Sequence, residues 1–137
     1  PLFGALSDRV GRRPVYLFGA ILTALFAFPF FWMLDSGSTP LIWLALVIAI
    51  AFGHASMYAP QAALLAELFG TRVRYTGASL GSQLASVLAG GLSPFIATAL
   101  FAAYGAGAVA GYLIAMSAIT IVAISVAAET LQRDINN

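Results

Sequence analysis

Charged residues in this chain are confined to a few short segments, and long uncharged stretches separate them. Four charges fall between Asp8 and Arg13, whereas the 21 residues from Pro14 to Leu34 carry none. Further uncharged stretches cover 36–66 and 75–128. An α-helix needs about 20 residues to cross a hydrocarbon core of roughly 30 Å, so each stretch is long enough to span a membrane. Charged residues make up 8% of the chain, against roughly a quarter in soluble domains, and we therefore predict an all-α integral membrane fold.

Turn residues divide the uncharged stretches into four predicted crossings. Before the second crossing, Ser38 or Thr39 can cap a helix and Pro40 suits its first turn. The 54 residues of 75–128 are too many for one helix and suit two, joined at 104–107. We expect a charged loop at 7–13, helices at about 14–34, 40–66, 75–103 and 108–128, and a tail at 129–137. Pro29, Pro60 and Pro94 should bend their helices, because proline removes a backbone donor.

The arginines indicate which way the chain crosses the membrane. Basic residues in short loops are retained on the cytoplasmic side. The arginines fall only in the first charged loop, the second charged loop and the tail: Arg9, Arg12, Arg13, Arg72, Arg74 and Arg133. We therefore predict a multi-pass protein of the plasma membrane, with both ends of this chain cytoplasmic. The turns at 35–40 and 104–107 should face outward, where Trp32, Trp43 and Tyr104 suit the headgroup zone.

Other classes of protein fit the composition less well. A soluble core of buried helices would need polar outer faces, and these stretches lack them. The net charge of +1 sits in loops and forms no basic face for nucleic acid. The sequence contains no metal-ligand spacing, nucleophile constellation or phosphate loop, so we expect neither a cofactor nor catalysis of a covalent reaction.

The first charged loop carries a recognisable motif, Gly-Ala-Leu-Ser-Asp-Arg-Val-Gly-Arg-Arg. It resembles the cytoplasmic loop signature of the major facilitator superfamily, and every fixed position of that signature is filled. The positions that carry this resemblance are Gly4, Asp8, Arg9, Gly11, Arg12 and Arg13. Gly11 permits a tight backbone reversal, while the arginines stay in water and at anionic headgroups. The acid of the loop is then free to face a helix N-terminus or an arginine.

The second charged loop points to a branch of that superfamily. The segment from Gln61 to Gly81, with Glu67-Leu-Phe and Arg74-Tyr-Thr-Gly-Ala-Ser, resembles the metabolite:proton symporters, as does Gly90-Gly-Leu-Ser-Pro. Gly70 departs from the proline that is commoner in this branch. The resemblance covers the whole chain and implies the last four helices of a twelve-helix transporter, preceded by the end of the eighth. Because the chain begins without Met, we expect it to be a fragment from the C-terminal half of such a transporter, in a bacterial inner membrane.

The function implied by this resemblance is secondary active transport by alternating access. Proton-coupled symport of a small organic acid or zwitterionic metabolite is the favoured activity, and the upstream helices and the bilayer are the expected partners. A sugar porter or a drug exporter of the same superfamily is the alternative, since 67–74 also resembles the sugar-porter loop. A membrane scaffold or receptor without transport activity is a third reading. Eight upstream helices with a second copy of the loop signature would favour transport.

The resemblance also implies a gate built from loop charges. Glu67 and either Arg12 or Arg13 are predicted at the same cytoplasmic surface, where they can pair and latch the inner gate, with Arg72 and Arg74 nearby. In the alternative interpretation these charges only fix the topology, and each exposed pair contributes roughly 0 to 1 kcal/mol.

Polar residues inside two crossings form stripes with helical spacing. On the second crossing these are His54, Tyr58 and Gln61, and on the third Thr76, Ser79, Gln83 and Ser86. The opposite side of the third crossing carries small residues, Gly77, Gly81 and Ala85, which permit close helix packing. By resemblance the stripes line the substrate cavity, and the principal proton-coupling acids lie upstream. Alternatively, the hydroxyls bond their own backbone, and His54 is a neutral residue bonded to a neighbouring helix rather than a contact for a proton or a carboxylate.

Overall fold

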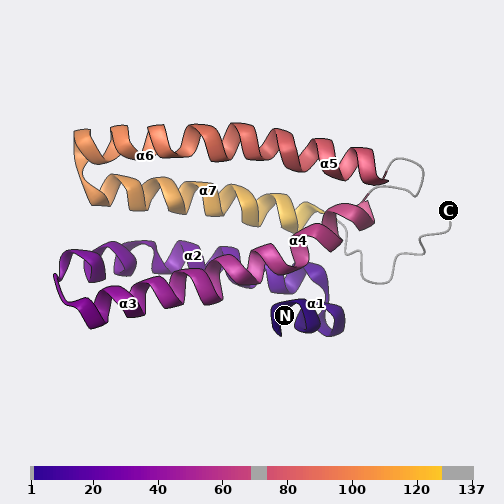
Figure 1. Ribbon diagram of the computed structural model, residues 1–137, viewed down its shortest axis with the longest axis horizontal. Coiled ribbons are helices and arrows are strands. Elements are labelled where there is room, and N and C mark those ends of the chain that lie inside the picture. The colour runs from indigo at the N-terminus through magenta and orange to yellow at the C-terminus, as the bar shows by residue number, and fades with distance from the viewer. Residues whose placement is uncertain (1, 69–73, 128–137) are drawn as a thin grey trace.

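The structure, a computed structural model, describes residues 2–68 and 74–127, and all of its regular elements are helices (Figure 1). This confirms the all-α prediction. The elements are α1 (Leu2–Val10), α2 (Arg12–Asp35), α3 (Thr39–Val47), η1 (Ile48–His54), α4 (Ala55–Leu68), α5 (Arg74–Ala85), η2 (Ser86–Gly90), α6 (Gly91–Tyr104) and α7 (Ala106–Val126). The two η segments are π-helical turns inside longer helices.

Joined through their π-helical turns, these elements make four helices in the described residues that are long and apolar enough to cross a membrane. They cover Arg12–Asp35, Thr39–Glu67, Tyr75–Tyr104 and Ala106–Val126. Such lengths match the roughly 30 Å of a hydrocarbon core. The chain is therefore a multi-pass membrane protein.

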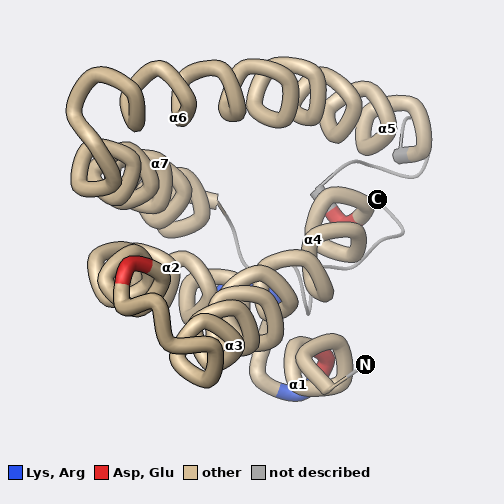
Figure 2. Tube along the Cα trace, turned by 60° about the vertical axis from the view of Figure 1, so that its left-hand side comes forward, with Lys and Arg blue, Asp and Glu red and all other residues tan. Residues whose placement is uncertain are grey.

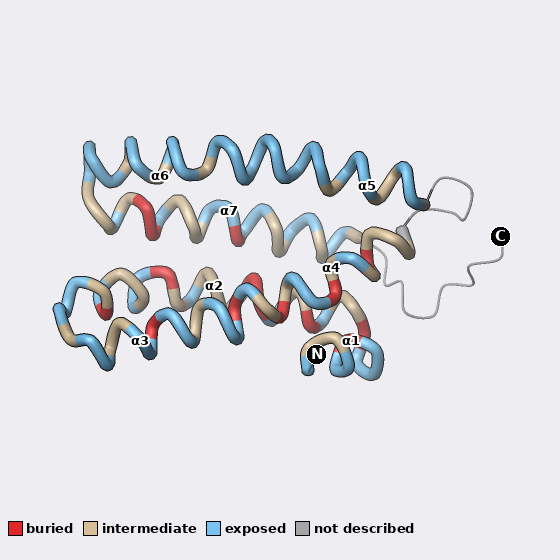
Figure 3. The backbone as a smooth tube through the Cα atoms, viewed as in Figure 1, coloured by how far each residue is buried: buried red, intermediate tan, exposed pale blue. Residues whose placement is uncertain are grey.

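Numbered along the chain, the four long helices lie side by side in the order second (α3 to α4), first (α2), fourth (α7) and third (α5 to α6). α2 contacts α4 and η1 on one side and α7 on another, while α6 packs on α7. Among the described elements of the second long helix, α4 is the part that contacts α5. Figure 3 shows the result: buried positions lie on α2 and its neighbours, whereas the third long helix has only exposed and intermediate positions.

Charges and tight turns lie at the ends of the bundle. Figure 1 shows the α2–α3 and α6–α7 turns together at one end, and α1, the end of α4 and the start of α5 at the other. In Figure 2 the coloured charged positions fall at helix ends and not in the middle of the long helices. Trp32, Trp43 and Tyr104 are all exposed. Ser38 occupies the N-cap position of α3, but its side chain makes no capping hydrogen bond.

The charged segment expected as a loop at 7–13 is mostly helical, which corrects that prediction. α1 continues to Val10, so Asp8 and Arg9 belong to its last turn. The Ser7 hydroxyl donates to Gly4 O at 2.8 Å, and Asp8 pairs with Arg12 four residues later. The chain reverses at a single residue, Gly11, whose φ of 118° favours glycine.

The π-helical turns precede two of the prolines. η2 ends at Gly90, four residues before Pro94, and η1 ends six residues before Pro60. A proline cannot donate to the carbonyl four residues earlier and its ring crowds that group. Local π-helical adjustment is one way in which membrane helices accommodate proline. Pro29 also lies inside a helix, α2.

One close helix contact was not expected from the sequence. It lies at Gly19 of α2, where a β-carbon would meet the Gly53 carbonyl at 2.8 Å and Met57 Cγ at 2.6 Å. By contrast, a β-carbon on Gly81, in the small stripe singled out above, meets nothing within 4 Å in the described part of the chain. Close packing therefore occurs between the first and second long helices.

Candidate functional site

Arg12 is the centre of a charged cluster at the end of the bundle. Its Nη2 and Nε lie 3.2 and 3.3 Å from Glu67 Oε1, which joins the start of α2 to the end of α4. Its Nη1 donates to Ser7 Oγ at 2.9 Å and also binds Asp8. A planar guanidinium can hold several acceptors at once, as it does here.

The Arg12–Glu67 pair is largely removed from solvent. The Arg12 side chain is 13% exposed and the Glu67 side chain 19%, whereas Asp8 is 62% exposed. Exposed pairs contribute little, but loss of one partner of a buried pair leaves an uncompensated charge. The pair is therefore more than a solvated charge at the surface.

Of the two arginines considered as partners of Glu67, Arg12 forms an ion pair with it, and Arg13 reaches α7. Arg13 Nε donates to Ile124 O at 3.0 Å, and its Nη2 donates to Ser125 O. Both acceptors lie in the last turn of α7. The first turn of α2 thus contacts α1, α4 and α7 through two neighbouring side chains.

The other residues predicted for the gating loop occupy different environments. Gly4 lies in α1 and its carbonyl accepts the Ser7 hydroxyl. Arg9 is exposed on α1, and Gly11 is buried at the reversal. Arg72 lies outside the described residues, and Arg74 begins α5.

A pocket with several polar side chains in its lining lies between α4 and α5, at the same end of the bundle as the cluster. Its volume is about 550 Å³. Small-molecule sites commonly occupy about 300 to 1,000 Å³, so the pocket is large enough for a metabolite. The residues that line it are Tyr58, Gln61, Ala62, Leu65, Ala66, Tyr75, Ala78, Ser79, Ser82 and Ser86.

The pocket brings together part of both predicted stripes. Tyr58 and Gln61 face Ser79 and Ser86 across it, whereas His54, Thr76 and Gln83 are absent from the lining. Tyr75 and Ser82 also line it, and neither belongs to the predicted stripes. The sequence does contain a pattern that includes Tyr75 and Ser82, since positions 75, 79, 82 and 86 also follow the helical period. Ala85, expected on a packed face, is exposed.

The stripe residues differ from most other hydroxyls in the described helices by their hydrogen bonding. The hydroxyls of Thr23, Ser56, Thr98, Thr120 and Ser125 donate to carbonyls three or four residues earlier. Within the described chain, the hydroxyls of Ser79 and Ser86 and the amide of Gln61 make no such bond. Polar groups inside a membrane need partners, so these groups require water, a ligand or another protein segment.

His54 makes a different contact. Its ring stacks on that of Tyr58, with centroids 5.5 Å apart and an interplanar angle of 24°. The residue is exposed at the last position of η1. The stacking places it next to a residue of the pocket lining.

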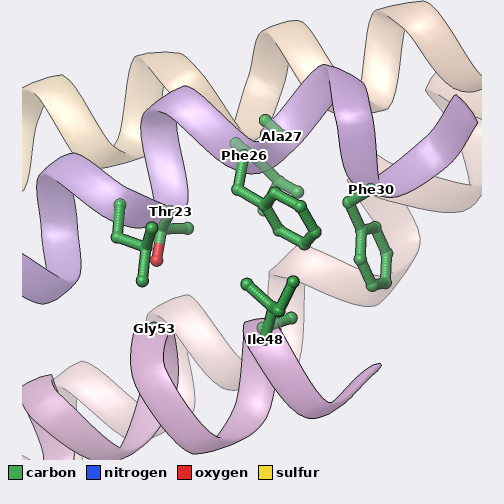
Figure 4. A pocket seen from close by; sticks show the side chains of 9 residues that line it. Thr23, Phe26, Ala27, Phe30, Ile48 and Gly53 are labelled. Atoms are coloured by element: carbon green, nitrogen blue, oxygen red, sulfur yellow. The ribbon is translucent and has the colours of Figure 1, made fainter. Parts of the chain in front are cut away.

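A second pocket, lined mostly by apolar side chains, lies between α2 and η1 (Figure 4). Phe26, Phe30 and Ile48 surround it, with the Thr23 hydroxyl on one side. That hydroxyl is already bonded to Gly19 O at 2.8 Å. The volume of about 180 Å³ lies below the usual range for small-molecule sites. The pocket between α4 and α5 is therefore the better candidate site.

Comparison with known proteins gives a consistent result. The sequence profile of the Major Facilitator Superfamily matches residues 1–134. The Shikimate transporter of Escherichia coli K12 is 42% identical over 84% of this chain and 27% of its own length. The Inner membrane metabolite transport protein YhjE of the same strain is 40% identical over 95% of this chain and 30% of its own. The Citrate-proton symporter of Klebsiella pneumoniae is 34% identical over 87% of this chain and 27% of its own length. The chain thus spans less than a third of each relative, and no solved structure matches significantly.

Proposed function

This chain belongs to the major facilitator superfamily, and we propose from that premise that it forms part of a secondary active transporter for a small metabolite. We further propose proton-coupled symport, because a related protein is described as a proton symporter. Shikimate and citrate are organic acids, which supports an organic acid or a zwitterion as substrate. A bacterial inner membrane, with both ends of this chain cytoplasmic, is part of the proposal.

The pocket between α4 and α5 is the observation that carries this proposal. Its lining offers hydroxyl, phenol and amide groups from the two long helices, and among the described residues the side chains of Ser79, Ser86 and Gln61 make no hydrogen bond. Such groups can exchange hydrogen bonds with water for hydrogen bonds with a polar solute at little net cost. Tyr58 lies nine residues before Glu67, which corresponds to about 13 Å along the helix. The pocket therefore extends from near the charged end toward the middle of the membrane.

The charged cluster supplies the proposed gate. Glu67 lies near the end of the helix that carries Tyr58 and Gln61, so a large movement of α4 away from α2 would break the Arg12–Glu67 contact. We propose that this pair holds the inner side closed and parts when the two halves of the transporter move. Asp8 binds Arg12 and remains exposed enough to approach another segment in the closed state.

Gln61 and Gln83 together test whether the pocket binds substrate. In the full-length protein, Gln61→Ala should weaken apparent substrate affinity about tenfold, since a lost hydrogen bond to a charged group is worth roughly 1.5 to 3 kcal/mol. Gln83→Ala should have a smaller effect, because Gln83 does not line the pocket. Binding of radiolabelled shikimate and of citrate to the purified variants would measure both changes.

The same variants also separate binding from packing. If Gln61 only links helices, Gln61→Ala will lower the melting temperature and leave affinity unchanged. If Gln83→Ala produces the larger loss of affinity, the substrate contacts the side of the third long helix that carries Gln83 and not this pocket.

The proposed orientation can be tested by labelling. Residues 1–137 contain no cysteine, so in a full-length protein whose other cysteines, if present, are replaced, cysteines placed at Ser36 and Asn137 give specific reporters. We expect an impermeant thiol reagent added to intact cells to label Ser36→Cys, on the outer α2–α3 turn, and to spare Asn137→Cys until the cells are opened. The reverse pattern would show that the arginine-rich end faces outward.

A further inference from the structure

Arg13 makes a long-range contact that the proposed transport cycle does not use. It lies in the first turn of α2, and both of its acceptors, Ile124 O and Ser125 O, lie in the last turn of α7. Successive side chains on a helix point about 100° apart, so Arg12 and Arg13 reach different neighbours from the same turn. Arg12 binds α1 and α4, and Arg13 binds α7.

The end of α7 needs a donor of this kind. The last carbonyls of an α-helix have no helical partner, and they carry partial negative charge. α7 ends at Val126, and the backbone of Ala127 is extended, with φ −62° and ψ 141°. The helical donor to Ile124 O would be the amide of residue 128, which lies beyond this end. The last turn of α7 itself contains no basic residue.

Within α2 itself, the position of Arg13 in the first turn is electrostatically unfavourable. A helix N-terminus carries partial positive charge, so a cation in the first turn is destabilising there. The first turn of α2 contains no acidic residue of its own, and the nearby carboxylates of Asp8 and Glu67 pair with Arg12. The contact with α7 offsets this unfavourable electrostatic interaction, because the Arg13 cation lies against the partially negative C-terminal end of another helix.

We propose that Arg13 is a positioning residue that caps α7 from a different helix and fixes its end against the first turn of α2. Through Arg12, the same turn is bound to Glu67. The charged end of the bundle thus joins α2, α4 and α7 into one unit. This inference does not depend on the identity of any substrate or on transport itself.

Hydrogen–deuterium exchange tests the cap directly. In the full-length protein in detergent, Arg13→Gln should accelerate amide exchange in 120–127 about tenfold, a ratio that corresponds to about 1.4 kcal/mol. Exchange in 106–112, at the other end of the same helix, should stay at the wild-type rate. Arg9→Gln is the matched control, since Arg9 is an exposed arginine on α1.

A second variant keeps the test decisive if Arg13→Gln is not recovered from the membrane. Arg13→Lys retains the charge but lacks the planar fork that reaches two successive carbonyls, so exchange in 120–127 should be intermediate. Wild-type exchange in 120–127 in the variants that are recovered would overturn the proposal. An equal acceleration over the whole of α7 would also overturn it, because that result indicates general destabilisation rather than a lost cap.

Discussion

Gly19→Ala is expected to destabilise the helix bundle by about 3 kcal/mol, the upper part of the range for overpacking. The added β-carbon would lie 2.8 Å from the Gly53 carbonyl oxygen and 2.6 Å from Met57 Cγ, with Ser56 Oγ also in the way. The methionine side chain can rotate, but the carbonyl is backbone. The first and second long helices must therefore separate, which weakens their contacts along the interface. Reversible unfolding in mixed detergent micelles would measure the loss.

Gly111→Ala provides the matched control for that experiment. Gly111 lies inside α7, and a β-carbon there meets no atom of residues 2–68 or 74–127 within 4 Å. Alanine is favoured over glycine inside a helix by about 1 kcal/mol, so this variant should be as stable as the wild type or slightly more stable. Equal stability of the Gly19 and Gly111 variants would show that the close approach of α2 to the second long helix is wrong.

Arg12→Gln is expected to cost about 2 to 4 kcal/mol, because it leaves the mostly buried carboxylate of Glu67 without this cation. The side-chain exposures of 13% and 19% place the pair between the exposed and fully buried cases. Arg9→Gln, the same substitution at an exposed site, should change stability by less than about 0.5 kcal/mol. Unfolding in mixed micelles would compare the two variants.

The double variant Arg12→Gln, Glu67→Gln distinguishes the pair from the individual charges. Its cost should be smaller than the sum of the two single costs, since the second substitution removes the uncompensated charge. Strict additivity would indicate that the two residues do not interact in the folded protein. For the proposed gate, the variants should also reduce uptake at equal amounts of protein in the membrane; unchanged uptake would reject the latch and leave the ion pair as a structural contact.

The polar stripe predicted on the third crossing agrees only in part with the residues that line the pocket. The sets 76, 79, 83, 86 and 75, 79, 82, 86 both follow the period of an α-helix. Only the position of α4 beside α5 selects the second set, which lines the pocket. Ser79 and Ser86 belong to both sets, and Gln83 belongs only to the first. The role of these residues in binding stays a prediction.

The sequence determined the membrane class, the four long apolar helices and the superfamily. Burial of charge in a hydrocarbon core is so costly that uncharged stretches of sufficient length identify the helices without any knowledge of their packing. The loop motif likewise depends only on local order. The tertiary structure alone decided that Arg12 pairs with Glu67, that Arg13 binds the end of α7, and that α2 approaches the second long helix closely at Gly19. Each of these depends on how a helix is rotated about its axis and which neighbour lies against it, and residues far apart in sequence fix both.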